Sequence, residues 1–494
     1  MNINITQKPL AVIDIGSNSI RLVVYSGAIR APIPIHNESY ICAIGKEIEV
    51  TGKLFHQGVE RALNVLKRFK GITDCMDLDD LYVLGTAALR DAKDGHNFIS
   101  YVKKETGFNI KILSGKEESE RSAYGVICGI PDADGLVADL GGGSLELVNI
   151  KKGSIEKNST FPLGTLRLSQ LSQNNIPKAK EIINQYIRNE KWIGLAEDRP
   201  LYAVGGSWRA LARVCISQMN YPLQVLDNFF LSSGESKELF DFISSLSPES
   251  IQNIKGVPKA RAAYLPIATL ILNTLLNISK AERLIFSVYG MREGQFYKSL
   301  PAELKSEDPL ISASKQICLS LNRDISLGDE VFEWLSPIII NEEPELIKLR
   351  KSASYLRDIC WMEHTDYRSE QAFLRVLRLP FMGIQHQDRA TLALTLFYRY
   401  GDDQTEIIRQ SCVMLKQKRL RWAKTIGLAL RLSYALTGGN EGLLKKTSIK
   451  VNNQKITLTI PEAEPVFYSG FYEKRLSRLA DHLGLISEVV IKRI

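Results

Sequence analysis

Two segments of the chain follow one plan: residues 11–25, AVIDIGSNSIRLVVY, and residues 135–150, GLVADLGGGSLELVNI. Each has a short apolar run, an Asp-x-Gly step, a small polar turn and a second apolar run. Two short apolar runs joined by a glycine-containing turn are typical of a β-hairpin. Because Asp, Gly and Ser take the same places in both segments, we infer an internal duplication of one α/β unit, with the two copies facing each other across a cleft.

The remainder of the first 300 residues alternates strand-like and helix-like stretches, which indicates α/β layers. Residues 58–70 have apolar side chains at helical spacing, and residues 81–84 form a short strand-like run. Beyond residue 300 the sequence becomes acidic and is interrupted by prolines, and residues 345–436 then read as successive helices. A final α/β piece begins with strand-like residues 448–451. We therefore expect a domain boundary near residues 300–310.

Composition excludes several classes of protein. The 494 residues are 45% hydrophobic and 24% charged, with a formal net charge of +8, values that are ordinary for a globular chain. No apolar run approaches the roughly 20 residues of a membrane span. Seven cysteines without a CxxC pair predict a reduced, cytoplasmic chain with buried thiols. Neither an HExxH nor a GxSxG motif is present, which leaves zinc peptidases and serine hydrolases unsupported.

The two glycine turns are candidate phosphate-binding loops. Gly16, Ser17, Asn18 and Ser19 form the first turn, and the second consists of Gly141, Gly142, Gly143 and Ser144. Glycine allows the backbone to approach a ligand closely, and successive N–H groups can surround a small anion. One such turn alone is more often a plain hairpin turn. The presence of two favours phosphate binding, although neither is a Walker loop.

Carboxylates adjoin these turns. Asp14 and Asp139 each precede a turn by one residue, where a carboxylate would repel a phosphate unless a cation lies between them. Phosphate and carboxylate oxygens suit Mg²⁺. Glu146 shares a strand face with Ser144 and would point the same way. A solvent-facing glutamate on an edge strand fits the spacing equally well.

A general base is expected in the strand-to-helix turn SGKEESE, but spacing alone does not select it. Ser114 and Glu117 fit a capping box, which leaves Glu118 and Glu120 as candidates. In a similar turn, Thr86 could cap a helix and Arg90 could reach from its first turn toward an anion.

The basic residues are concentrated late in the chain. Residues 401–450 contain ten basic and four acidic residues, and the densest cluster includes Lys416, Lys418, Arg419 and Arg421. These side chains could form a track for a polyanion or simply a solvated helix face. Only Trp422 is interleaved among them, so stacking on nucleic-acid bases has little support.

Together the motifs resemble the exopolyphosphatase/guanosine-pentaphosphate phosphohydrolase (Ppx/GppA) family. The matching stretches run in order across residues 9–300: AVIDIGSNSIRLVV, VLGTAALRDA, ILSGKEESERSAYGV, GLVADLGGGSLELV, FPLGTLRL, YAVGGSWRAL and SVYGMREGQFY. The resemblance implies a duplicated pair of actin-like, ribonuclease-H-like (ASKHA) α/β domains, followed by an α-helical HD-like domain and a small C-terminal α/β domain. The corresponding ranges are residues 1–127, 128–304, 305–437 and 438–494.

The resemblance also implies roles for residues. It selects Glu118 as the general base, places Asp139 and Glu146 at a catalytic Mg²⁺, and puts Arg90 on the phosphate chain. Arg21 occupies a variable position after the first loop. Gly205, Gly206 and Ser207 resemble a further glycine turn near the cleft. In the HD-like domain, Arg357 and Asp358 stand where related sequences show His and an acidic residue, so no second metal site is expected.

The activity implied is Mg²⁺-dependent, processive removal of terminal orthophosphate from inorganic polyphosphate, in a cytoplasmic homodimer that needs neither nucleic acid nor membrane. The alternatives are hydrolysis of guanosine pentaphosphate at the same site and a non-catalytic sensor of polyphosphate or of guanosine penta- or tetraphosphate. A sugar kinase of the actin-like superfamily fits less well, because the sequence has the glutamate motif of the phosphohydrolases.

Overall fold

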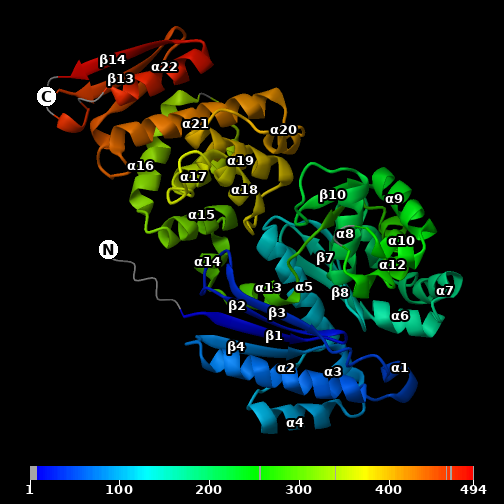
Figure 1. Ribbon diagram of the computed structural model, residues 1–494. Helices are drawn as coiled ribbons and strands as arrows, with labels where there is room; N and C mark the ends of the chain where they lie inside the picture. Colours follow the sequence, from blue (N-terminus) through cyan, green and yellow to red (C-terminus); the bar gives the residue numbers. More distant parts are fainter. Residues whose placement is uncertain (1–7, 255–256, 340, 463, 468–469, 493–494) are drawn as a thin grey trace. The chain divides into compact units, whose positions relative to one another are not determined.

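The structure, a computed structural model, describes residues 8–254, 257–339, 341–462, 464–467 and 470–492 (Figure 1). The chain divides into two compact units, residues 1–307 and 308–494, and each is described by itself.

The first unit begins with a five-stranded mixed sheet in the order β3-β2-β1-β4-β5. The β1–β2 and β2–β3 pairs are antiparallel, whereas β1–β4 and β4–β5 are parallel. Apolar residues of α2 and α4 pack with those of β1 and β2 in one buried cluster. The elements are β1 (Leu10–Ile15), β2 (Ser19–Tyr25), β3 (Pro34–Ile41), α1 (Ile48–Thr51), α2 (His56–Asp74), β4 (Asp80–Gly85), α3 (Ala87–Asp91), α4 (Gly95–Thr106) and β5 (Lys111–Ile112). We call them lobe I.

A second sheet repeats this order, with β8-β7-β6-β9-β11 in the places of β3-β2-β1-β4-β5 and β10 added at one edge. The β6–β7 and β7–β8 pairs are antiparallel and the β6–β9 and β9–β11 pairs are parallel, as in lobe I. The internal duplication inferred from the hairpins is therefore visible as shared topology. Its elements, called lobe II, are β6 (Gly135–Leu140), β7 (Leu145–Lys151), β8 (Ser154–Phe161), α6 (Thr165–Ser172), α7 (Ile176–Ile187), η1 (Lys191–Ala196), β9 (Leu201–Val204), α8 (Gly206–Gln218), β10 (Phe229–Ser232), α9 (Ser233–Ser245), α10 (Pro248–Gln252), α11 (Lys259–Ala262), α12 (Leu265–Ser279) and β11 (Arg283–Phe286).

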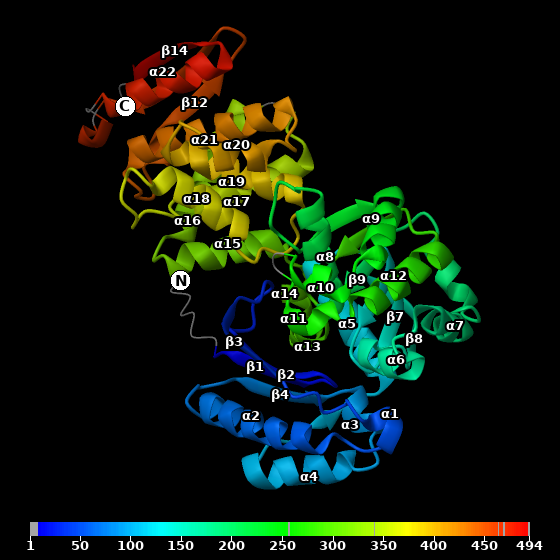
Figure 2. The ribbon, with the colours of Figure 1, turned by 45° about the vertical axis from the view of Figure 1, so that its right-hand side comes forward.

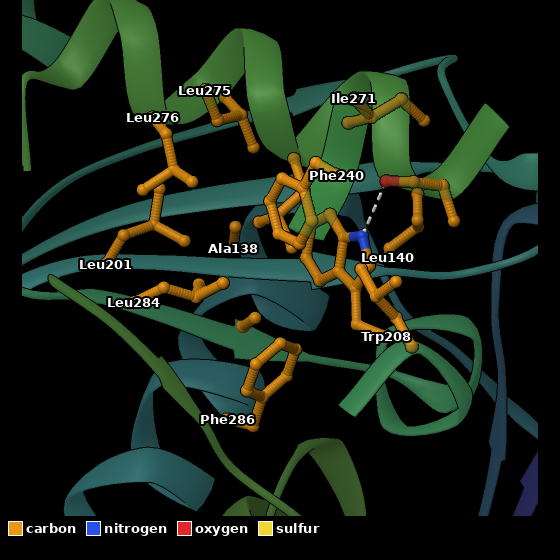
Figure 3. Packing of buried hydrophobic residues seen from close by; sticks show 14 of the residues in the cluster. Ala138, Leu140, Leu201, Trp208, Phe240, Ile271, Leu275, Leu276, Leu284 and Phe286 are labelled. Atoms are coloured by element: carbon orange, nitrogen blue, oxygen red, sulfur yellow. Dashed lines mark hydrogen bonds between the residues drawn. The ribbon is translucent and has the colours of Figure 1, made fainter. Parts of the chain in front are cut away.

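The core of lobe II anchors the start of α8. Trp208 is completely buried between α12 and the sheet, where its Nε1 donates a hydrogen bond to the Ala268 carbonyl at 2.8 Å (Figure 3). Phe240 and Leu140 lie beside the indole in the same cluster. Because Trp208 is held in this way, the turn at Gly205 that precedes α8 is fixed relative to the sheet.

Two helices complete the first unit by crossing each other closely. They are α5 (Gly115–Gly129) and α13 (Met291–Ser299), and α14 (Ala302–Ser306) follows. A Cβ atom added to Gly294 would lie 1.6 Å from the Arg121 carbonyl oxygen, and one added to Gly125 would lie 2.2 Å from the Gly290 carbonyl oxygen. Only glycine permits this approach, and α13 also packs against β1.

The second unit contains a group of helices followed by a small mixed sheet (Figure 2). In the sheet, β12 pairs antiparallel with β13, β14 pairs parallel with β13, and α22 packs against it. The elements are α15 (Pro309–Ser320), α16 (Ile325–Leu335), η2 (Ser336–Ile338), α17 (Pro344–Leu356), α18 (Arg368–Arg378), α19 (His386–Tyr400), α20 (Glu406–Cys412), α21 (Gln417–Thr437), η3 (Leu444–Lys446), β12 (Ser448–Val451), β13 (Lys455–Pro461), η4 (Pro465–Phe467), α22 (Phe471–Leu483) and β14 (Ile486–Lys492). The likeness to an HD-type domain stays a prediction.

One expectation about the cysteines needs correction. All seven are free thiols, and six are buried as expected, but Cys75 is exposed at the end of α2. Among the described residues, no helix is long and apolar enough to cross a membrane.

Candidate active site

The two hairpins have the same local geometry. In each turn the first glycine donates its N–H to the carbonyl of the serine three residues later, Gly16 to Ser19 and Gly141 to Ser144, both at 3.0 Å. The residues that precede the turns also correspond. Asp14 lies opposite Arg21 across β1 and β2, whereas Asp139 lies opposite Glu146 across β6 and β7. The duplicated frame therefore carries opposite charges in lobe I and two carboxylates in lobe II.

Both turns line one cavity of about 190 Å³ within the first unit. Gly142 and Gly143 come close to Ser17, and a Cβ on Gly143 would lie 2.8 Å from the Ser17 hydroxyl oxygen. The cavity brings together every site residue that the sequence predicts in the first 300 residues except Arg90: Asp14, Gly16, Ser17, Asn18, Ser19, Arg21, Thr86, Glu118, Asp139, Gly141, Gly142, Gly143, Ser144 and Glu146.

One end of the cavity is rich in buried carboxyl groups. Glu118 is 6% exposed and Glu146 4% exposed. Burial raises the pKa of Glu118 to about 7, against the opposing effect of Arg90. The pKa of Glu146 is also raised well above its ordinary value, by burial first and then by the charges of Glu118 and Asp139. The Oε1 atom of Glu146 has no hydrogen-bond partner among the described residues. This carboxyl group can therefore take up a proton or bind a cation.

The start of α5 explains why Glu118 turns inward. Ser114 caps the helix and forms a capping box with Glu117, as the sequence predicts. Glu117 is therefore occupied at the helix end, and Glu120 is only partly buried. Glu118, the next residue after the box, is directed into the cavity wall.

Two neighbouring side chains differ from expectation. Arg90 does not line the cavity, because its guanidinium donates hydrogen bonds to the Glu118 carboxylate and to the Leu113 carbonyl, the latter at 2.8 Å. Thr86 precedes α3 at the capping position, but its hydroxyl donates to the Ile15 carbonyl at 3.2 Å instead of capping the helix. Thr86 therefore lines the cavity with its hydroxyl bound to β1, whereas Arg90 contacts the cavity residue Glu118.

The other predicted carboxylates have partners. Asp14 Oδ2 accepts a hydrogen bond from Arg292 Nη1 at 2.9 Å. The Ser122 hydroxyl donates to Asp139 Oδ2. Burial nevertheless raises the pKa of both carboxyl groups, which shows that these contacts offset only part of the desolvation cost.

Arginines also line the cavity, and sequence reasoning missed three of them. Arg209, Arg261 and Arg292 line it together with Arg21. The pKa of Arg209 falls to about 9, first because of burial and then because of repulsion by the other three guanidiniums. Its Nη1 donates to the Val288 carbonyl at 3.2 Å. Like charges held this closely suit a ligand with several negative charges.

The predicted basic track lies on α21 in the second unit. Lys418 forms an ion pair with Glu343, and Arg419 forms one with Asp388 at 2.6 Å. Lys416 and Arg421 are exposed. Trp422 is buried and its Nε1 donates to Glu342 at 2.8 Å. Of the four predicted cations, two are therefore neutralised by acidic residues.

The donor set near the two turns can be tested against Mg²⁺. Among the described residues, no three His, Cys, Asp or Glu side chains are grouped as metal ligands. Mg²⁺ in phosphoryl-transfer sites, however, is commonly bound by one or two carboxylates together with substrate phosphates. Asp139 and Glu146 face the cavity from paired positions, and Glu146 Oε1 is unpaired. These residues fit such a shared site.

The comparisons agree with this architecture. The model of the Ppx/GppA phosphatase family matches residues 12–303, and a second model, described as the C-terminal part of exopolyphosphatase, matches residues 310–490. A solved exopolyphosphatase structure from Cytophaga hutchinsonii, 22% identical, aligns over 60% of this chain and 99% of that chain with a TM-score of 0.54. The first unit thus has the actin-like fold of a phosphatase. The chain belongs to the Ppx/GppA phosphatase family.

Three curated relatives indicate the range of names in this group. Retrograde regulation protein 2 of Saccharomyces cerevisiae is 25% identical over 490 residues, which cover 87% of this chain and 81% of the relative. Exopolyphosphatase 1 of Mycobacterium tuberculosis is 24% identical over 310 residues, which cover 60% and 89%. The guanosine-5'-triphosphate,3'-diphosphate pyrophosphatase of Aeromonas salmonicida is 23% identical over 482 residues, which cover 92% of each chain.

Proposed function

We propose that this chain is an exopolyphosphatase, a hydrolase that removes terminal orthophosphate from inorganic polyphosphate with Mg²⁺. The observation that carries the proposal is the composition of the cavity, which is lined by two glycine turns, four carboxyl groups and four arginines. A polyphosphate end fits this arrangement because it offers a reacting phosphate and several further negative charges.

In the proposed reaction, a water oxygen attacks the terminal phosphorus in line with the bridging oxygen that leaves. The P–O bond to the penultimate phosphate breaks, and the shortened chain departs as an anion. Glu118 accepts the proton of the attacking water, for which a pKa near neutrality suits a general base. The N–H groups of the two turns hold the phosphate oxygens, and fixed donors of this kind stabilise the charge of a transferring phosphoryl group.

Mg²⁺ would be held by Asp139 and Glu146, and it would offset the negative charge shared by these carboxylates and the substrate phosphates. Asp14 belongs to the predicted ligand set as well, but its contact with Arg292 makes it the weaker candidate. Arg21, Arg209 and Arg261 would hold phosphates that are not transferred.

A longer chain would be guided by Lys416 and Arg421, two exposed residues of the predicted track that form no ion pair with a described residue. Lys418 and Arg419 contribute less to this proposal, because each has an acidic partner. Processive cleavage and a homodimer remain expectations that come from the family resemblance, and the cytoplasmic location remains an expectation from the cysteine content.

Guanosine pentaphosphate is the second candidate substrate, favoured by the Aeromonas salmonicida relative that aligns over 92% of this chain. The deciding experiment measures orthophosphate release with Mg²⁺ from long polyphosphate, short polyphosphate and guanosine pentaphosphate. We expect the highest kcat/KM with long polyphosphate. Preference for the nucleotide would select the second candidate, and tight binding of polyphosphate without any release would identify a sensor instead.

A further inference from the structure

Three arginines of the second unit surround one aspartate. Arg323 precedes α16, Arg357 and Asp358 follow the end of α17, and Arg399 lies in α19. Both Arg323 Nε and Arg357 Nε approach Asp358 Oδ2, at 3.8 Å and 3.6 Å, and Arg399 Nη2 approaches Oδ1 at 3.4 Å. These distances are long for ion-pair hydrogen bonds, which are usually below about 3 Å. The three arginines therefore surround Asp358 without forming short hydrogen bonds to it.

Most of this cluster is buried and has unused polar atoms. Arg357 and Asp358 are each 3% exposed and Arg399 is 6% exposed. Arg323 Nε, Arg357 Nη2, Arg399 Nε and Asp358 Oδ2 have no hydrogen-bond partner among the described residues. Buried polar groups in folded proteins are nearly always paired. Arg323 Nε and Asp358 Oδ2 face each other only beyond hydrogen-bond distance, and Arg357 Nη2 and Arg399 Nε have no acceptor among the described residues, which points to a polar ligand.

Neighbouring groups do not cancel the excess positive charge. The guanidinium of Arg323 stacks on Trp361, and that of Arg399 stacks on Tyr434, which orients both planes but leaves their edges available for hydrogen bonds. Asp324, which follows Arg323 in the sequence, is also acidic. It is exposed, however, and its carboxylate accepts the Ser326 N–H at 2.7 Å. Three cations thus share one buried carboxylate.

We propose that this cluster binds orthophosphate. Guanidinium groups match phosphate oxygens in charge and geometry, and three of them would balance Asp358 together with a doubly charged anion. At neutral pH orthophosphate keeps at least one proton, whereas sulfate has none. Asp358 Oδ2 would accept the hydrogen bond of that P–O–H group, and it would repel sulfate. The site therefore selects phosphate over sulfate, and it does so whatever the catalytic substrate is.

The test uses the full chain without Mg²⁺ and measures binding of inorganic phosphate, with and without sulfate, by isothermal titration calorimetry. We expect Arg323→Gln to weaken one phosphate-binding step at least tenfold. Arg323 is suitable because it is the most exposed of the three arginines, with 29% of its side chain accessible. Arg409→Gln is the matched control, since the one ion pair that Arg409 forms with a described residue is with exposed Glu406, and we expect no change.

A second variant tests the role of the carboxylate and preserves shape. Asp358→Asn replaces the acceptor with an amide that can also donate, so sulfate should then bind about as well as phosphate. Thermal unfolding in anion-free buffer shows whether each variant is folded. Wild-type protein that binds sulfate as tightly as phosphate at this step, or an Arg323→Gln protein that binds phosphate like the wild type, would overturn the proposal. If both variants fail to fold, wild-type protein must still show one phosphate-binding step that sulfate cannot replace, and the absence of such a step would overturn the proposal.

Discussion

Asp139 and Glu146 lie directly opposite each other on the antiparallel strands β6 and β7, and both line the cavity, Glu146 buried and Asp139 partly buried. Like charges at opposed positions of a sheet destabilise it. The equivalent positions of lobe I hold Asp14 and Arg21, which attract each other. Lobe II thus has two repelling carboxylates at the positions where lobe I has an attracting pair. A repelling pair of this kind is typical of a functional site.

Replacing Glu146 with glutamine should stabilise the cation-free protein. The raised pKa of Glu146 means that its carboxyl group favours folding below its ordinary pKa of 4.5, and that this contribution is lost as the pH rises through the higher folded-state value. We expect Glu146→Gln to gain about 1–2 kcal/mol at pH 8, and the gain to vanish in acid. Chemical denaturation at both pH values measures this. Glu156→Gln, on the neighbouring strand, should show no such gain.

Replacing Glu118 with glutamine should suppress catalysis and preserve binding. Loss of a general base lowers kcat by roughly 10²–10⁴-fold. Orthophosphate release and polyphosphate affinity are the two measurements. Glu117→Gln is the matched control, because glutamine can still form the capping box with Ser114. An active Glu118→Gln enzyme would remove Glu118 from its proposed role.

The pH profile should depend on Arg90. A base with a pKa of about 7 must lose its proton, so the rate should rise as the pH passes through that value. Arg90 lowers the pKa of Glu118, and removing its charge should raise that pKa. Arg90→Gln should therefore shift the acidic limb of the rate profile toward alkaline pH, while Arg90→Lys shifts it less. A profile that stays in place would contradict this coupling.

Arg209 should affect substrate binding more than turnover. A residue that holds phosphates remote from the reaction binds ground and transition states alike, so its loss raises KM and changes kcat little. We expect Arg209→Gln to raise KM for polyphosphate about tenfold or more, as loss of a charge-assisted hydrogen bond typically does. Arg213, one turn further along α8, does not line the cavity, and Arg213→Gln provides the comparison. Equal effects of the two substitutions would refute the assignment.

The exposed track residues should affect only long substrates. The double variant Lys416→Gln, Arg421→Gln should lower kcat/KM for long polyphosphate several-fold and leave that for short chains unchanged. Lys418→Gln should do little, because Lys418 is already paired with Glu343. Kinetics on chains of defined length test this, and an equal loss on short chains would show that these lysine and arginine side chains act in another way.

Both hairpins and their turns could be predicted from the sequence because their signal is local: Asp, Gly and Ser recur in fixed order between apolar runs. The choice of Glu118 needed the family resemblance, since only the capping box and the inward direction of the next residue distinguish it from Glu120. The polar edge strands β3 and β8 gave no apolar pattern, because most of their side chains are exposed or only partly buried.

The arginines of the cavity could not be predicted, for a different reason. Arg209, Arg261 and Arg292 come from three separate helices, and an isolated arginine in a helix normally faces water. The pairing of Arg419 with Asp388 escaped prediction likewise, since the partner lies on another helix. Such contacts depend on tertiary packing, which no local pattern records.

The close crossing of α5 and α13 has a consequence for variation in this chain. Gly294 touches no substrate group, yet a single methyl group there would collide with the Arg121 carbonyl and push α13 outward. Arg292 is carried by the same helix and would move with it, away from Asp14. Loss of activity in a Gly294→Ala enzyme would thus report a displaced helix, and a survey of variants that judged positions by their distance from the cavity would misread it.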